Sequence, residues 1–155
     1  MADRLVVMSE GEVKQVGTQK ELYEHPADRF VAGFVGRSNF LSGTMTGPGR
    51  FETRGGLAIA CASGMTGPAV MALRPERLAL GAAASGLDNR LPGTVELVSY
   101  LGASIDVHVR VSPADRIVIT QPNRGQIPEE GDRTEIGWPA GAAVVFPDDG
   151  TAAHA

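Results

Sequence analysis

The sequence predicts a mainly β protein, a small sandwich or barrel, preceded by a short segment that mixes strands and helices. Short apolar runs separated by glycine and proline fill the chain beyond residue 37, a pattern typical of sandwiches and small barrels. A helical period occurs only before that point. Aromatic residues make up 5% of the chain and apolar residues 43%, so aliphatic side chains must build most of the core.

The chain is predicted to begin with a hairpin. Leu5-Val6-Val7-Met8 and the run from Val13 to Val16 flank a polar turn that contains Gly11. Two short apolar runs around a glycine-containing turn favour a pair of antiparallel strands.

Two short helices are expected to follow the hairpin. Thr18 and Glu21 have the spacing of a capping box, so we expect a helix to begin there. Pro26 prevents its continuation and allows a second helix to begin nearby. The second helix is expected to end near Gly36. Its period places four apolar residues on one face: Phe30, Val31, Phe34 and Val35.

The second part of the chain contains nine predicted strands. They cover residues 40–46, 50–53, 57–61, 69–73, 93–99, 104–111, 116–120, 133–138 and 143–146. The clearest is Ile105–Val111, whose odd positions are aliphatic and whose even positions are polar, as in a strand with one solvated face. We expect it to pair with Thr94–Ser99 across the turn at 100–103. Cys61, inside an apolar run, is expected to be a buried thiol.

The change in pattern near residue 37 predicts a domain boundary. We assign residues 1–36 to one unit, residues 37–150 to a β domain and residues 151–155 to a disordered tail. The net charge of −4 argues against nucleic-acid binding, which needs clustered basic residues. No run approaches the about 20 apolar residues that cross a bilayer. We therefore expect a cytoplasmic chain that reaches a membrane only through a partner.

Catalytic motifs are absent from the sequence. The only lysines, Lys14 and Lys20, do not stand in a phosphate-binding loop. The three histidines, His25, His108 and His154, lack metal-ligand spacing, and His108 is expected to be solvated. The paired carboxylates Glu129-Glu130 and Asp148-Asp149 are expected to be surface charge. We therefore predict no catalytic residue, no metal ligand and no cofactor-binding residue in this chain.

Several stretches, in order, resemble the C-terminal third of ATP-binding proteins of ABC importers, notably the polyamine, iron and sugar importer branch. Leu5-Val6-Val7-Met8 with Gly11, and the stretch from Gly17-Thr18 to Gly36, are similar to the end of the family's nucleotide-binding domain. Asn39-Phe40-Leu41 resembles the start of its appended TOBE (transport-associated OB) domain. Within that domain, Arg74-Pro75-Glu76, Gly93-Thr94-Val95, Tyr100-Leu101-Gly102, Gly131-Asp132 and Trp138 match further motifs.

The resemblance implies an OB-like β-barrel behind the tail of a nucleotide-binding domain, and a non-catalytic regulatory or dimer-supporting role. ATP and Mg would bind in the full-length parent, upstream of this region, and the parent would be the ATPase. The implied partners are a second copy of the subunit, forming a homodimer, and the permease subunits. The implied location is the cytoplasmic face of the bacterial inner membrane, through the permease. Polyamines such as spermidine or putrescine are one implied substrate class.

Arg74 and Glu76 are the candidate site residues, and two interpretations stay open for them. In the first, Pro75 sets a turn and the flanking charges bond nearby backbone. In the second, Arg74 and Glu76 make a contact between domains or between subunits.

Three other functions are also compatible with some feature of the sequence. The barrel could sense a small ligand, either an oxyanion or the transported substrate, with Asp106 facing a cationic polyamine. It could bind nucleic acid as other OB modules do, although aromatic residues are few. It could be an enzyme in its own right, which the missing motifs disfavour.

Overall fold

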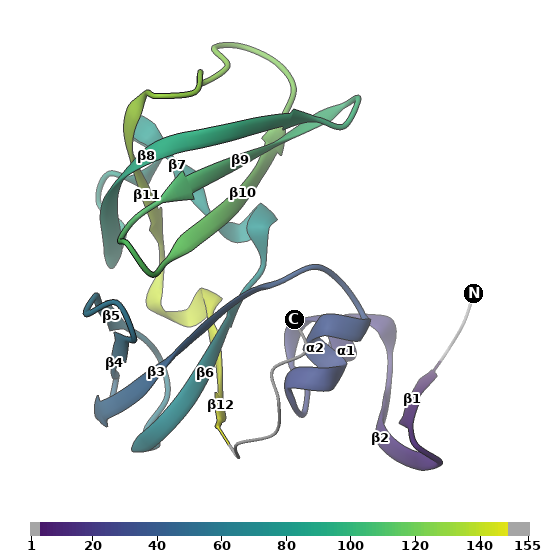
Figure 1. The fold of residues 1–155 in the computed structure, drawn as a ribbon. Helices are drawn as coiled ribbons and strands as arrows, with labels where there is room; N and C mark the ends of the chain where they lie inside the picture. Colours follow the sequence, from purple (N-terminus) through teal and green to yellow (C-terminus); the bar gives the residue numbers. More distant parts are fainter. Residues whose placement is uncertain (1–3, 149–155) are drawn as a thin grey trace.

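The computed structural model describes residues 4–148, and its main elements are two antiparallel sheets of five strands each (Figure 1). The first sheet contains β3 (Asn39–Gly47), β4 (Arg50–Thr53), β5 (Ala58–Ala60), β6 (Gly67–Leu73) and β12 (Val144–Pro147). The second contains β7 (Ala79–Leu80), β8 (Asn89–Tyr100), β9 (Ser104–Arg110), β10 (Arg116–Pro122) and β11 (Arg133–Trp138). The strand orders are β12-β6-β3-β4-β5 and β10-β9-β8-β11-β7. We call these two sheets together the barrel.

Each of the nine predicted runs is a strand, with ends that shift by a few residues. Ile105 to Val109 pairs with Val95 to Tyr100 as expected, and Gly102 in the intervening turn has a φ of +84°. The strand β7 was not predicted, because two residues are too short to show a period. Three short 3-10 helices complete the barrel: η1 (Pro75–Arg77), η2 (Gly81–Ala84) and η3 (Ala140–Ala142).

The two sheets share one hydrophobic core. Its buried side chains come from both sheets and form a single cluster, with Trp138 and Phe51 as the largest members. Cys61 belongs to the same cluster and is a free thiol, 7% exposed, which confirms the prediction for this residue. The fold is therefore a mainly β, OB-like barrel, in agreement with the fold class expected above.

The N-terminal segment, residues 4–36, begins with the predicted hairpin. The strands β1 (Leu5–Ser9) and β2 (Glu12–Gly17) pair in antiparallel register. Glu10 and Gly11 have φ values of +51° and +79°, and positive φ at both central residues is the signature of a type I′ hairpin turn. The side chain of Gln15 holds the hairpin to the helices, because it donates to His25 O and accepts from Ala27 N.

Both predicted helices are present and short. In α1 (Gln19–Glu24), Thr18 and Glu21 form the predicted capping box. Asp28 caps α2 (Arg29–Phe34), so this helix begins three residues after Pro26. The predicted apolar face of α2 is wrong in part. Val31 is buried, but Phe30 and Phe34 are 41% and 66% exposed and stack on each other, because α2 presents the neighbouring stripe of Val31 and Ala32 to the interior.

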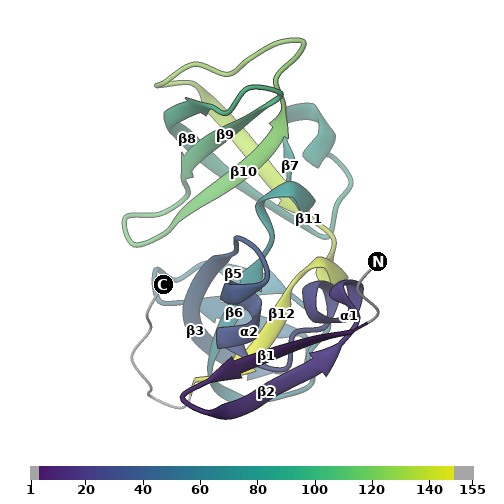
Figure 2. The same ribbon diagram turned by 90° about the vertical axis from the view of Figure 1, so that its right-hand side faces the viewer.

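The helices lie between the hairpin and the β6–β12 side of the first sheet (Figures 1 and 2). Val7, Leu22 and Val31 form one small cluster inside the N-terminal segment. Ala32 joins Ala72 and Phe146 in a second small cluster against the barrel. The assignment of residues 1–36 and 37–150 to separate domains stays a prediction, and the predicted tail at 151–155 lies outside the described residues.

Strand β3 lies very close to strand β4 at Gly43. A Cβ atom at this position would collide with the backbone oxygen of Glu52 on β4 and would lie 2.8 Å from the Phe51 ring. We predict that Gly43→Ala lowers the free energy of unfolding by about 1–3 kcal/mol, because a strand paired on both sides cannot move away. Gly47→Ala is the matched control, since no atom lies within 4 Å of its added methyl. Urea denaturation measures both, and equal midpoints would contradict the prediction.

Candidate functional site

Arg74 joins the N-terminal segment to the barrel. It directly follows β6, where Pro75 opens the 3-10 helix η1. Its Nη1 donates to Ala32 O at 2.8 Å and to Arg37 O at 3.1 Å, and its Nη2 donates to Tyr23 O at 3.2 Å. The guanidinium carbon also lies 4.4 Å from the centre of the Tyr23 ring. These partners precede Arg74 by 37 to 51 residues, so the interpretation as a purely local turn is wrong for Arg74.

The carbonyl groups that Arg74 binds explain why an arginine stands here. Tyr23 and Ala32 lie in the last turns of α1 and α2, where helix carbonyls have no partner within the helix. A guanidinium carries several donors in a fixed plane, so one side chain can satisfy both helix ends and the carbonyl of Arg37. Burial, and secondarily the charge of Arg77, lower the pKa of Arg74 from its usual value.

Glu76 and Arg77 lie on the exposed side of the same turn. Glu76 is exposed, and its side chain makes no hydrogen bond or ion pair with residues 4–148. Arg77 lies 3.6 Å from Glu24 of α1 in a half-exposed ion pair. We call the contact of Arg74 with the N-terminal segment the joint; an exposed ion pair of this kind adds little to its stability. A contact of Arg74 or Glu76 with another subunit stays a prediction.

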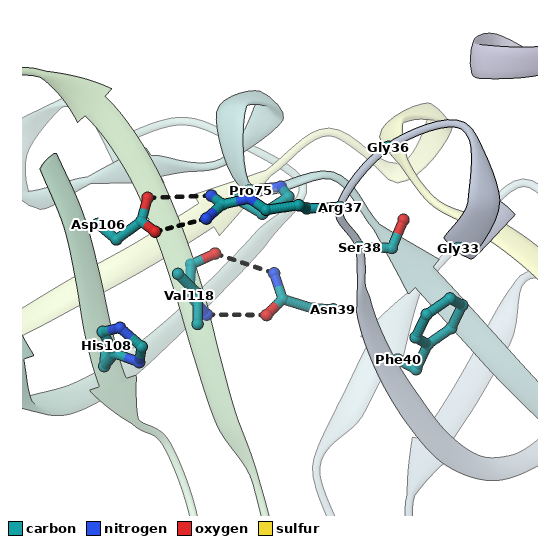
Figure 3. A pocket seen from close by; sticks show the side chains of 10 residues that line it. All are labelled: Gly33, Gly36, Arg37, Ser38, Asn39, Phe40, Pro75, Asp106, His108 and Val118. Atoms are coloured by element: carbon teal, nitrogen blue, oxygen red, sulfur yellow. Dashed lines mark hydrogen bonds and ion pairs between the residues drawn. The ribbon is translucent and has the colours of Figure 1, made fainter. Parts of the chain in front are cut away.

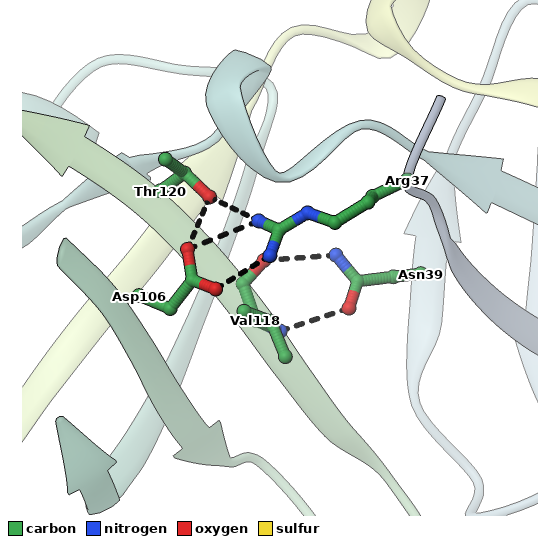
Figure 4. Close-up of polar contacts among 5 residues, drawn as sticks. All are labelled: Arg37, Asn39, Asp106, Val118 and Thr120. Carbon is green, nitrogen blue, oxygen red and sulfur yellow. Dashed lines mark hydrogen bonds and ion pairs between the residues drawn. The ribbon is translucent and has the colours of Figure 1, made fainter. Parts of the chain in front are cut away.

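Arg37 makes a second contact with the barrel (Figure 4). Its guanidinium forms a bidentate ion pair with Asp106 on β9, at 2.6 and 3.0 Å, and donates to Thr120 Oγ1 on β10 at 2.7 Å. Thr120 in turn donates to Asp106 at 2.7 Å. The Arg37 hydrogen bond is the main cause that lowers the pKa of Asp106, and the Thr120 hydrogen bond adds to it.

Asp106 is 6% exposed, so the predicted solvated face of β9 is wrong at this position. The residues that follow α2 fold back over the strand and bring Arg37 to it. This arrangement leaves Asp106 without a free oxygen for a cationic ligand, because both oxygens bind Arg37 and one also accepts from Thr120.

Asn39 covers the outer edge of β10 (Figure 3). Its side chain accepts from Val118 N at 2.8 Å and donates to Val118 O at 2.9 Å, as a neighbouring strand would. It also donates to Leu73 O on β6 at 3.3 Å. Asn39 therefore connects the two sheets and closes part of a sheet edge that would otherwise be unpaired.

A shallow pocket of about 350 Å³ lies beside these contacts. Phe40, Pro75 and Val118 form part of its wall, and His108 lies at one side (Figure 3). His108 is partly exposed and its Nδ1 is buried without a hydrogen-bond partner among residues 4–148, so the prediction of a solvated histidine is wrong in part. Burial is the main cause that lowers the pKa of His108, and Arg116 contributes.

Sequence reasoning named Arg74 but missed Arg37, Asn39 and Thr120. Arg37 and Asp106 are 69 residues apart in the chain, and no local pattern indicates that a strand-face aspartate has a partner so distant. Among residues 4–148, no group of three histidine, cysteine or acidic residues could hold a metal ion. His154 and Asp149 lie outside the described residues.

The outer face of the β1–β2 hairpin is apolar and uncovered. Val6 faces Val16 and Met8 faces Val13 across the ladder, so the four side chains lie on one face. Their exposed fractions range from 45% to 57%. Two-stranded sheets are marginal without packing on a hydrophobic face, and here only the face that carries Val7 packs on the helices. No helix among residues 4–148 is long and apolar enough to span a membrane.

Replacement of Arg74 should weaken the joint strongly. We predict that Arg74→Met lowers the free energy of unfolding by about 2–4 kcal/mol, because three buried or partly buried carbonyl groups lose their donor. Arg74→Lys should recover only part of this loss, since an ammonium cannot reach three carbonyl groups with the geometry of a guanidinium. Glu76→Gln, which changes no contact, is the control. A destabilisation by Arg74→Met no larger than that of the control would contradict this role.

The Asp106 ion pair should make stability depend on pH. The pKa of Asp106 is lower in the folded protein than in the unfolded chain. Its contribution is therefore complete above the unfolded value of about 3.9 and is lost as the pH falls through the lower folded value. We predict that Asp106→Asn costs about 1–2 kcal/mol at pH 7 and flattens the acid limb of a stability–pH profile. Glu135→Gln, which removes an exposed carboxylate without a side-chain partner, is the matched control, and equal effects of the two variants would contradict the prediction.

Residues 71–146 match the TOBE domain family. The spermidine/putrescine import ATP-binding protein PotA of Ruegeria pomeroyi is 33% identical over 162 residues, which cover 96% of this chain and 42% of that protein. PotA 1 of Pseudomonas aeruginosa is 40% identical over 131 residues, covering 79% and 35%. The sn-glycerol-3-phosphate import ATP-binding protein UgpC of Salmonella typhi is 41% identical over 117 residues, covering 71% and 32%. The chain thus spans less than half the length of these relatives.

The cytoplasmic molybdate-binding protein ModG has a similar fold, with a TM-score of 0.60, over 70% of this chain and 95% of that chain. The two sequences are 16% identical, so the similarity concerns the fold alone. The family match spans the predicted motifs from Arg74 to Trp138, and the match to the Ruegeria pomeroyi protein covers 96% of the chain. This chain therefore belongs to the ATP-binding proteins of ABC importers and corresponds to their C-terminal part, with its TOBE domain at residues 71–146.

Proposed function

We propose that this chain is the non-catalytic regulatory and dimer-supporting region of an importer's ATP-binding subunit. The observation that carries the proposal is the joint at Arg74. A residue of the TOBE domain binds carbonyl groups at the ends of two helices in the segment that resembles the end of a nucleotide-binding domain. A barrel attached in this way can hold two ATPase bodies near each other while they separate, because it raises their effective concentration.

The remainder of the subunit is the proposed partner of the apolar hairpin face. Val6, Met8, Val13 and Val16 form a ready surface for packing, and a patch of this kind marks an interaction site when it stays exposed. ATP and Mg would bind to that remainder, together with the residues that hydrolyse ATP. The permease subunits and a second copy of the ATP-binding subunit complete the proposed assembly, on the cytoplasmic face of the inner membrane.

The similar proteins do not point to a single transported substrate. Proteins similar to the chain include importers named for spermidine and putrescine and one named for sn-glycerol-3-phosphate. Polyamine sensing at Asp106 finds no support in the geometry, since Arg37 and Thr120 occupy both carboxylate oxygens. We therefore favour a mechanical role of the barrel over ligand sensing at Asp106.

The proposal predicts a separation of transport from nucleotide binding. In the complete subunit assembled with its permease in proteoliposomes, Arg74→Lys should lower the transport rate several-fold and leave ATP affinity unchanged, because the altered contact lies outside the ATP site. Glu76→Gln should transport like the unaltered protein. Thermal unfolding of each variant establishes that it is folded. A folded Arg74→Lys subunit with full transport would refute the role of the joint.

A further inference from the structure

The two contacts between the N-terminal segment and the barrel differ in their exposure. Arg74 is 6% exposed; its hydrogen bond to Ala32 O is buried, and those to Arg37 O and Tyr23 O are partly buried. The side chain of Arg37 is 58% exposed, although its partner Asp106 is 8% exposed. Arg37 can therefore leave Asp106 for water without crossing protein, whereas Arg74 cannot leave its carbonyl partners without disrupting the helix ends.

The apolar contact between the two parts is small. Ala32, Ala72 and Phe146 form its buried centre, with Phe40 and Val144 packed at the side. This cluster is separate from the barrel core and from the cluster of Val7, Leu22 and Val31 inside the N-terminal segment. The segment thus has its own core. A small, largely polar interface between two parts with separate cores favours relative motion.

The connector between helix α2 and strand β3, residues 35–38, is short. Helix α2 ends at Phe34 with Val35 as its C-cap, and β3 begins at Asn39. Arg74 holds the connector at the carbonyl of Arg37, and Asp106 and Thr120 hold it at the Arg37 side chain. Arg37 is therefore held at two points. The buried Arg74 binds its carbonyl group, and Asp106 binds its solvent-accessible side chain.

We propose that Arg37 is a releasable latch that fixes the orientation of the N-terminal segment on the barrel, with the buried Arg74 as the pivot that remains when the latch opens. The latch rests on the proposed function, since it would control whether a movement of the ATPase part of the subunit is transmitted to the barrel. With Arg37 bound to Asp106, the segment and the barrel turn together. With Arg37 released, the segment turns about Arg74 while both cores stay intact.

The charged groups around the latch keep it closed at neutral pH. Asp106 and His108 lie on β9, Arg116 and Thr120 on β10, Glu96 on β8 and Arg37 on the connector. The pKa of Asp106 is lowered, so its carboxylate stays charged down to acidic pH. The pKa of His108 is lowered as well, so at neutral pH the histidine is uncharged and does not compete with Arg37 for Asp106. A partner or a competing ion, rather than a neutral-range pH change, is therefore the expected trigger.

Hydrogen exchange of the chain measures the latch directly. We expect Arg37→Met to speed amide exchange of residues 29–38 by about tenfold or more, because local opening no longer breaks the ion pair. The core strands at 105–109 and 117–119 should exchange as before. Arg54→Met, which removes an exposed arginine without a side-chain partner, is the matched control. Unchanged exchange at 29–38, or an equal rise throughout the barrel, would overturn the latch.

A distance measurement separates reorientation from local fraying. Spin labels at Lys20→Cys on α1 and Arg124→Cys on the barrel, in a chain with Cys61→Ala, report the relation of the two parts. One narrow distance distribution is expected with Arg37 present, and a second population is expected after Arg37→Met. A single unchanged distribution would overturn the latch and leave the proposed transport role standing. Loss of transport by Arg74→Lys, in contrast, is measured independently of the latch.

Discussion

The placement of the N-terminal segment depends on one buried cation. Arg74 supplies donors to the carbonyl ends of two short helices and to the connector between them and the barrel. Helices of six residues are too short to be stable alone, so they need capping groups and packing from outside. The capping box of Thr18, the cap of Asp28 and the guanidinium of Arg74 satisfy their ends, and the hairpin and the barrel cover their sides.

The barrel is organised to receive this segment on one side. Its two sheets share a core that contains none of the residues of α1 or α2. The contacts with the segment are a small apolar cluster around Ala32 and polar contacts of Arg74 and Arg37. Within the barrel, Asn39 replaces a strand partner at Val118. Asp106 and Thr120 accept hydrogen bonds from the Arg37 side chain. A polar joint of this kind gives a defined orientation without the large buried area that would make the two parts inseparable.

The chemistry of these contacts agrees with a mechanical part of a transporter subunit. In this site Arg74 holds carbonyl groups in place by hydrogen bonds, and Arg37 holds the Asp106 carboxylate. Together with the apolar outer face of the hairpin, these contacts support the proposal that the region transmits contacts between neighbouring bodies. The TOBE domain match and the importer relatives place this region in the C-terminal part of the ATP-binding proteins.

The sequence by itself determined the elements of this protein. The alternation of apolar and polar residues, the turn residues and the capping box are patterns that span only a few residues. The hairpin, both helices and nine strands could therefore be predicted from local patterns. The tertiary structure alone decided which polar residues meet. Arg37 reaches Asp106 across 69 residues and Arg74 reaches Tyr23 across 51, and only the packing of the helices on the barrel brings these groups together. The same packing decided that Phe30 and Phe34 stay exposed and that Asp106 does not, because the burial of a strand or helix face depends on what lies against it.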